Sequence, residues 1–306
     1  MNINIYDVSK KAGVSIATVS RVLNGNTRVS EKTRDKVINA MKELDYTPNV
    51  FARGLGLNTM KTIGIMCIDS SDIYLANAVY YLEQELRKYN YDSILCCTGK
   101  DYNNKKNYLE LLLSKRVDGI ILAGSQFVEN TSKHNNDYII NAAKDVPIVL
   151  VNGYLDADNI YSVMCNDEEA VYNATKLLIN NSHRNIVYLY TSTSYSGMNK
   201  YRGYLKAINE AGITLPDEFH HLCGKNISHA RDYLTYLYDK GMKFDAVMTS
   251  DDSIAAGAVK FAHTHGIRIP EDLEVIGYNN SVLSLCTEPE LTSIDSKVEE
   301  LSSCAV

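Results

Sequence analysis

The sequence lacks the features of an exported or membrane-anchored protein. The N-terminus has no basic region followed by an apolar stretch, so no secretory signal is present. No apolar run reaches the roughly 18 residues of a membrane span. The seven cysteines are odd in number and show no Cys-x-x-Cys spacing, which favours free thiols over a disulfide framework. We therefore expect a cytoplasmic protein without a membrane partner.

Enzyme signatures are scarce as well. The sequence has no phosphate-cradling Gly-x-x-x-x-Gly-Lys-Ser/Thr loop and no Gly-x-Ser-x-Gly nucleophile elbow. The histidines lack the spacing of a zinc site. The sequence thus predicts no catalytic residue, no metal and no cofactor.

What the sequence does have is an uneven distribution of charge. The 306 residues carry a net charge of −6. Residues 1–60 contain nine Lys or Arg and five Asp or Glu, a net charge of +4. Residues 61–306 contain 22 Lys or Arg and 32 Asp or Glu, a net charge of −10. A basic head on an acidic body indicates that only the head meets a polyanion.

The head is predicted to form three short helices. Their inward residues are, in order, Ile5, Val8 and Ala12; Val19, Val22 and Leu23; and Val37, Ala40, Met41 and Leu44. Asn4, Ser15 and Ser30 precede these repeats as N-caps, and Gly13 allows a tight turn between the first two helices. This spacing is that of a helix-turn-helix, although small exposed helical units without a DNA-binding role are also common.

The outward face of the second helix consists of small or hydroxylated residues and one arginine: Ser15, Ile16, Ala17, Thr18, Ser20 and Arg21. Arg21 suits a bidentate contact with guanine, and Ile16 or Ala17 suits a thymine methyl group. The next segment, residues 46–55, leaves the third helix through a turn at Pro48 and then forms a weak helix of about two turns, since Gly54 and Gly56 each cost ~1 kcal/mol relative to alanine. Leu55 in this segment either wedges between base steps or packs under the body.

The body alternates apolar strands with amphipathic helices, which predicts parallel sheets covered on both faces, a doubly wound α/β fold. The expected strands are 63–68, 93–97, 119–122, 147–151, 162–164, 186–190, 246–248 and 274–276. The expected helices are 73–89, 105–114, 168–181, 201–211, 229–240 and 253–265. Short polar residues and tyrosines follow the strands, where such sheets bind ligands. They suit a small polar ligand, although turn formation explains each one equally well.

Three stretches carry a family resemblance: Ile5–Asn24, Ala52–Leu55 and Lys61–Ile65. They resemble the headpiece, hinge helix and first body strand of the LacI/GalR family, and the second helix is most similar to its catabolite-control branch. The resemblance extends to about residue 295. It implies a sequence-specific transcriptional regulator, a repressor of carbohydrate or catabolite genes, that binds a pseudo-palindromic operator as a homodimer. An α/β enzyme or a solute-binding protein is the alternative; the head argues against both. Adjacent Asp251 and Asp252 would suit a metal or acid/base pair, but the same resemblance implies a structural position for Asp252 at the start of a helix.

The resemblance also implies a domain division. Residues 1–48 form the DNA-binding head, 49–61 the hinge, and 62–306 a body like the periplasmic sugar-binding proteins. The two subdomains are expected at 62–160 plus 291–306 and at 161–290. By the same resemblance Ile16, Ala17 and Arg21 face bases. The remaining implied DNA contacts are Ser15, Thr18, Ser20, Asn24, Arg53 near the backbone, and Leu55 opening a central base step.

An effector site is implied in the body, at Ser70, Tyr74, Ser125, Thr191, Lys200, Asp252 and Asn279. Family members that bind sugars or purines have Arg where this chain has Lys200, and Asp where it has Asn279, so tight hexose binding is not expected. The candidate effectors are a small sugar, a sugar phosphate, and a phosphorylated phosphocarrier protein that docks on helix 73–89. Ser296 is expected to cap a last helix, and the chain to lack a C-terminal segment that relatives have.

Overall fold

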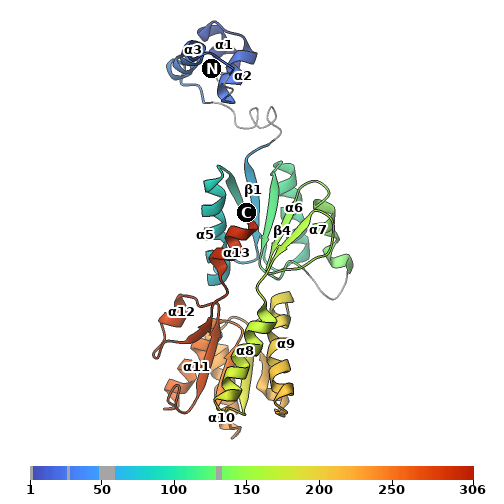
Figure 1. Cartoon of the computed structure of the whole chain (residues 1–306), viewed down its shortest axis with the longest axis vertical. Coiled ribbons are helices and arrows are strands. Elements are labelled where there is room, and N and C mark those ends of the chain that lie inside the picture. The colour runs from blue at the N-terminus through green and yellow to red at the C-terminus, as the bar shows by residue number, and fades with distance from the viewer. Residues whose placement is uncertain (1–2, 26–27, 48–58, 129–132) are drawn as a thin grey trace.

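The computed structural model describes residues 3–25, 28–47, 59–128 and 133–306. Three helices form the head at one end of the molecule (Figure 1): α1 (Ile5–Ala12), α2 (Ile16–Leu23) and α3 (Glu31–Glu43). Each begins at the predicted cap, with the Asn4, Ser15 and Ser30 side chains accepting backbone N–H groups of the first turn. Gly13 ends α1 at a φ of 66°, a conformation that glycine adopts without steric cost.

The core of the head is small and aliphatic. It consists of Val8, Val19, Val22, Val37 and Ala40, with partly buried neighbours around them. These are the residues whose helical spacing predicted the three helices. Each helix buries one stripe against the other two, and this packing stabilises helices that are too short to persist alone.

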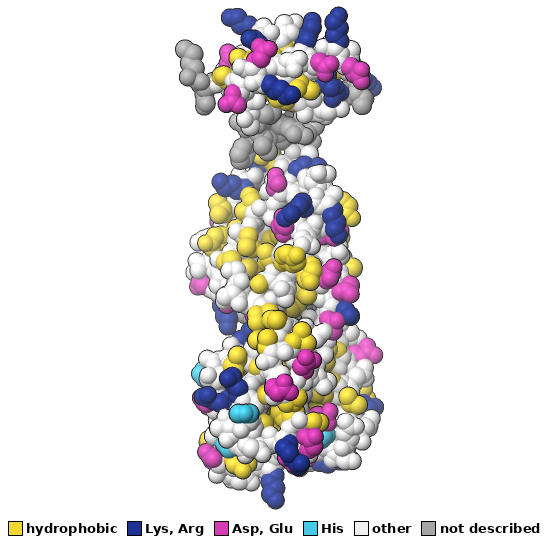
Figure 2. Space-filling model, turned by 90° about the vertical axis from the view of Figure 1, so that its left-hand side faces the viewer, with side chains coloured by type: hydrophobic (Ala, Val, Ile, Leu, Met, Phe, Trp, Pro, Cys, Tyr) yellow, Lys and Arg dark blue, Asp and Glu magenta, His cyan; other side chains and the backbone are white. Residues whose placement is uncertain are grey.

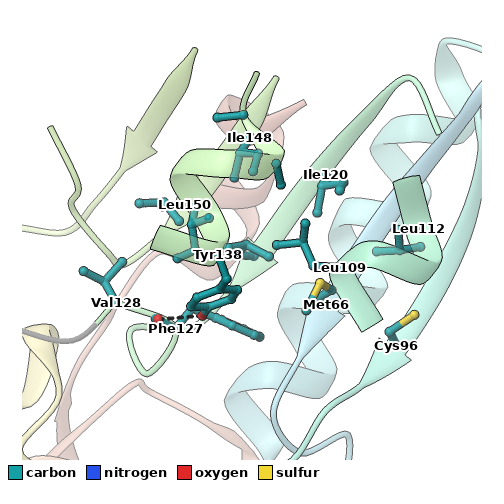
Figure 3. Close-up of a cluster of buried hydrophobic side chains, with 14 of the residues drawn as sticks. Met66, Cys96, Leu109, Leu112, Ile120, Phe127, Val128, Tyr138, Ile148 and Leu150 are labelled. Carbon is teal, nitrogen blue, oxygen red and sulfur yellow. Dashed lines mark hydrogen bonds between the residues drawn. The ribbon is translucent and has the colours of Figure 1, made fainter. Parts of the chain in front are cut away.

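The first sheet of the body is parallel, with strand order β2-β1-β3-β4-β5. Its strands are β1 (Thr62–Cys67), β2 (Asp92–Cys97), β3 (Gly119–Ala123), β4 (Ile148–Val151) and β5 (Ile160–Val163). Its helices are α5 (Ile73–Lys88), α6 (Tyr102–Ser114), α7 (Asp137–Ala142) and the C-terminal α13 (Val298–Ala305). One core lies under α6 and α7, where buried Tyr138 donates its phenolic hydroxyl to the Phe127 carbonyl at 2.8 Å (Figure 3). The other lies under α5 and α13.

The second sheet is also parallel, with order β10-β9-β8-β6-β7. Its strands are β6 (Ile186–Tyr190), β7 (His220–Leu222), β8 (Ala246–Thr249), β9 (Glu274–Tyr278) and β10 (Thr292–Ile294). Its helices are α8 (Asp167–Asn180), α9 (Tyr195–Glu210), α10 (Ile227–Asp239), α11 (Asp252–Thr264) and the short α12 (Val282–Leu285). Helices α8 and α9 cover one face, and α10 and α11 cover the other.

Helices α8 and α9 approach closely because Gly203 has no side chain. A Cβ atom at this position would stand 2.1 Å from the Glu168 carbonyl oxygen and 3.0 Å from the Tyr172 nitrogen. Both are backbone atoms, so neither can turn away. Gly203 therefore sets the distance between the two helices that carry one wall of the second subdomain.

The predicted doubly wound, two-subdomain α/β body is confirmed, but its internal boundaries differ from those expected. Strand β5 pairs with β4, so residues 161–163 belong to the first sheet. Strand β10 pairs with β9, so residues 292–294 belong to the second. Strands β7 and β10, three residues each, were not predicted, because so short a run shows no periodicity. Helix α9 begins at Tyr195, six residues before the expected start.

The expected cap at Ser296 is wrong. Helix α13 follows Lys297, which adopts a left-handed φ of 51° and makes no side-chain cap bond. The Ser296 hydroxyl is buried and has no partner among the described residues. The expected last helix does form and pack: Leu301 and Ala305 are buried, and the Ser302 hydroxyl reaches the Ala78 carbonyl of α5 at 3.4 Å. Among the described residues, no helix is long and apolar enough to cross a bilayer.

Candidate nucleic-acid interface and interdomain cleft

Helix α2 presents the predicted reading face to solvent. Ser15, Ile16, Ala17 and Arg21 are exposed, Ile16 by 38% although it is a large aliphatic residue. Its inner residues Val19 and Val22 hold the helix against α1 and α3. A helix with small outward side chains can approach the floor of a DNA major groove, and Arg21 lies on the same side to reach a base edge.

Three other residues that were predicted to contact DNA are less accessible to it. Thr18 and Ser20 are half-buried, and the Thr18 hydroxyl lies 2.9 Å from the Ser15 hydroxyl. Asn24 is the C-cap of α2, and its side-chain oxygen is buried without a partner among the described residues. The predicted contacts Arg53 and Leu55, and most of the expected hinge 49–61, lie outside the described residues.

A cleft lies where the carboxyl ends of the two sheets face each other. Segments that follow β1, β3 and β4 line it from the first subdomain, and segments that follow β6, β7, β8 and β9 line it from the second. Its polar lining consists of Asp72, Tyr74, Ser125, Gln126, Asn152, Thr191, Ser192, Ser194, Ser196, Lys200, Lys225, Ser250, Asp251 and Asn279. The cavity measures about 70 Å³. Since pockets that hold small molecules usually measure about 300–1,000 Å³, the cleft is narrow at this point in this conformation.

Direct contacts bridge the two walls of the cleft. The Lys225 ammonium from the second subdomain pairs with Asp72, which also caps α5 in the first subdomain, and with Asp251 at 3.1 Å. The Ser125 hydroxyl donates to the Ser194 hydroxyl across the same gap at 2.8 Å. Burial opposes the charge of Lys225, but Asp251 and Asp72 together raise its pKa above the ordinary value.

A second lysine lies deeper. Lys200 is 8% exposed, donates to the Ser250 carbonyl at 3.2 Å, and stands 3.5 Å from the centre of the Tyr278 ring. Burial lowers the pKa of Lys200, and Asp167 and Asp251 oppose that effect. The Tyr278 hydroxyl donates to buried Asp167. A buried cation, an aromatic ring and a carboxylate thus form one network beneath the cleft.

Five of the seven predicted effector residues line this cleft: Tyr74, Ser125, Thr191, Lys200 and Asn279. Tyr74 accepts a hydrogen bond from the Asn152 amide at 2.6 Å, and the Asn279 amide donates to Asp251 at 3.1 Å. The prediction for the other two is not supported by their positions. Ser70 is exposed outside the cleft lining.

Asp252 has a structural contact set instead. It is 1% exposed, and its two oxygens accept the Ser293 hydroxyl at 2.5 Å and the Ser281 backbone N–H at 2.6 Å. Burial raises the pKa of Asp252 above its ordinary value despite these bonds. It therefore fastens α11 to the segments around β10, and it is the neighbouring Asp251 that reaches the cleft.

Sequence reasoning missed Lys225, which bridges the cleft. Lys225 follows β7, and because that strand is too short to be predicted, the sequence does not indicate that Lys225 stands at the carboxyl end of a strand. Asp72 and Asp251 stand after predicted strands, whereas the cation that joins them stands after a strand that was not predicted. The signal that was available is the Gly224-Lys225 pair, a turn-forming glycine and a cation directly after His220–Cys223.

Comparison with known proteins places both parts of the chain. Residues 4–49 match the model for bacterial regulatory proteins of the lacI family, and residues 60–303 match that for periplasmic binding proteins and the sugar-binding domain of the LacI family. A helix-turn-helix transcriptional regulator of Lachnoclostridium phytofermentans is 56% identical over 298 residues, 97% of this chain and 89% of that protein. Catabolite control protein A of Priestia megaterium is 32% identical over 310 residues, 100% of this chain and 91% of that protein.

Solved structures show the same fold. A structure of the lac repressor dimer bound to operator and the anti-inducer ONPF superposes with a TM-score of 0.89 at 24% identity, over 100% of this chain and 91% of that one. The fold, the head and the body therefore agree with one family along the whole described chain. This chain belongs to the LacI family of bacterial transcriptional regulators.

Proposed function

We propose that this regulator reads one operator half-site with the exposed face of α2. Arg21 contacts a guanine through both edge acceptors, Ile16 and Ala17 contact thymine methyl groups, and Ser15 at the helix N-terminus contacts phosphate. The observation that carries the proposal is the exposure of these four side chains on a helix whose inner face is fully engaged. The fold match to an operator-bound lac repressor supports the same orientation of the head.

We infer a homodimer because one chain reads only one half-site. One reading helix per chain contacts one half of a two-fold site, so a second copy supplies the other half. The surface supports pairing along the side where α5 and α12 lie, on which hydrophobic side chains run down both subdomains (Figure 2). Tyr80 of α5 is 55% exposed, and Val282 and Leu285 of α12 are 59% and 65% exposed. Contiguous exposed apolar surface of this kind is typical of subunit contacts.

Binding-site selection from a random duplex library tests the readout. The wild-type chain should select a pseudo-palindrome, and Arg21→Ala should lose preference at one symmetric pair of positions only. Sedimentation on the selected duplex should give two protomers per site. One protomer per site at saturation, or an unchanged preference in Arg21→Ala, would contradict the proposal. A genomic binding map would then show whether the target genes are catabolic and repressed.

The cleft is proposed to take a small polar effector, a sugar or a sugar phosphate. The hydroxyl- and amide-rich lining suits such a ligand, and two lysines suit its phosphate. A phosphorylated phosphocarrier protein on α5 is the second candidate, favoured by the 32% identity with a catabolite control protein. Calorimetry with hexoses, hexose phosphates and the phosphorylated carrier separates them. Turnover of any of these sugars would instead favour an enzyme in the cleft.

A further inference from the structure

Two cysteines meet on neighbouring strands at the cleft end of the first sheet. Cys67 ends β1, Cys97 ends β2, and the two are direct partners in the parallel register. Their sulfur atoms lie 3.6 Å apart. Five further cysteines are dispersed over the described chain, and no other sulfur–sulfur contact is present among the described residues.

The backbone geometry at this pair fits a disulfide. Neighbouring strands are about 4.8 Å apart, which lies within the roughly 4.4–6.8 Å that Cα atoms of a disulfide span. Side chains at register partners of parallel strands point to the same face, so both sulfurs lie on one side of the sheet. We therefore expect rotation about the side-chain bonds to bring the two sulfurs together from their 3.6 Å separation.

The two thiols differ in access to solvent. Cys97 is exposed on β2, an edge strand of the sheet, whereas Cys67 is fully buried. Burial, with Cys97 adjacent, raises the pKa of the Cys67 thiol to about 12. A peroxide reacts with an accessible thiolate, so Cys97 is the thiol that meets an oxidant first and Cys67 is the one held ready beside it.

We propose that Cys67 and Cys97 are a peroxide-oxidised thiol pair that closes to an intrachain disulfide. The Cys97 sulfur attacks hydrogen peroxide, forming an S–O bond as the O–O bond breaks, and the leaving hydroxide takes up the thiol proton as water. The Cys67 sulfur then attacks the Cys97 sulfenic acid, the S–O bond breaks, and its hydroxyl leaves with the Cys67 proton as a second water. Two thiols are oxidised to one disulfide while one peroxide is reduced to two waters.

The test is oxidation of the full chain, reduced first and then exposed to hydrogen peroxide. Alkylation should find two fewer free thiols, the intact mass should fall by two hydrogens, and digestion should yield one peptide pair joined through Cys67 and Cys97. Dithiothreitol should reverse all three changes. Cys97→Ser, an exposed substitution that leaves the core intact, should abolish the mass loss, and Cys67→Ser should do the same if its melting curve matches the wild type.

Control variants identify the partner sulfur. Cys96→Ser should still form the bond, because Cys96 is buried on the opposite face of β2. Cys286→Ser combined with Cys304→Ser should form it as well. A disulfide between Cys96 and Cys97, a covalent dimer on a non-reducing gel, or Cys97 oxidised to sulfinic acid with Cys67 still free would each overturn the proposal.

Discussion

The head and the body use their residues differently. In the head, the core of Val8, Val19, Val22, Val37 and Ala40 lies inside, and the proposed DNA contacts Ile16, Ala17 and Arg21 lie outside. In the body, the cleft residues Lys200, Asp251 and Asn152 are themselves buried and hydrogen-bonded. The residues that we propose to contact bases are therefore separate from the core of the head, whereas the proposed effector contacts of the body also carry structural bonds. Substitutions can break or sharpen this contrast.

The largest effect is expected at Gly203, a body residue outside the lining of the cleft. Gly203→Ala places a Cβ atom 2.1 Å from a backbone carbonyl and should lower the free energy of unfolding by about 3 kcal/mol. Chemical denaturation measures the change. Gly119→Ala is the matched control, because its Cβ atom would meet neighbours only at 3.4 Å and beyond. Equal stability of the two variants would show that α8 and α9 separate without cost.

In the head, Arg21→Ala should weaken operator binding by about 2 kcal/mol, because a bidentate contact with guanine is lost. Its melting temperature should stay at the wild-type value because the side chain is exposed. Fluorescence anisotropy on the selected operator and thermal melting give the two numbers. A clear fall in melting temperature would contradict the separation of binding from stability in the head.

Tyr278→Phe tests the shared role in the body at a smaller scale. It removes the hydrogen bond to buried Asp167 while keeping the ring beneath Lys200, and it should cost about 1.5 kcal/mol of unfolding free energy. Effector binding should weaken together with stability, because the same network borders the cleft. Tyr161→Phe, at a tyrosine of β5 that is 58% exposed, should change neither quantity.

Lys225→Met should destabilise the body by about 1 kcal/mol, since 38% of the lysine side chain is exposed and solvent screens its ion pairs. The pKa of Lys225 is raised in the folded chain, so its contribution is fully present below the ordinary lysine value of 10.5. It is lost only as the pH rises through the raised folded value. The difference in unfolding free energy between wild type and variant should therefore be constant from neutral pH to about 10.5. It should then shrink as the pH rises towards the raised pKa of the folded chain.

The smallest effect is expected for an exposed ion pair of the head. Lys11 and Glu43 approach to 2.8 Å, but their side chains are 49% and 59% exposed. Lys11→Met should change the unfolding free energy by less than about 0.5 kcal/mol. A double-mutant cycle with Glu43→Gln isolates the coupling, and a value above about 1 kcal/mol would show that the head relies on surface charge.

The sequence predictions were more accurate for the head than for the cleft of the body. Local signals sufficed for the head, because Asn4, Ser15 and Ser30 cap helices through bonds to their own first turn. The boundaries of the long buried strands were also predicted to within a residue or two, because a continuous apolar run is a local signal as well. The cleft depends instead on which strand ends meet in space, and two three-residue strands, β7 and β10, gave no periodic signal.

Errors at single residues have the same origin. Asp251 and Asp252 are neighbours of the same type, yet one reaches the cleft and the other fastens β10, a difference decided by the backbone direction after β8. Ser296 stands where a cap belongs, but Lys297 turns into the left-handed region and leaves the hydroxyl unused. Composition and spacing carry no information on such turns.

The Lys225 bridge has a consequence for how an effector is measured. The Lys225 ammonium is attached to the cleft wall, so it competes with any incoming ligand for Asp72 and Asp251. Its effective concentration is fixed by the fold and does not change on dilution. The apparent dissociation constant equals the intrinsic one divided by the fraction of molecules whose bridge is open. Added salt weakens the bridge at Asp72 and so increases that fraction. A neutral ligand should accordingly bind this protein more tightly as ionic strength rises, the reverse of the dependence expected for its DNA.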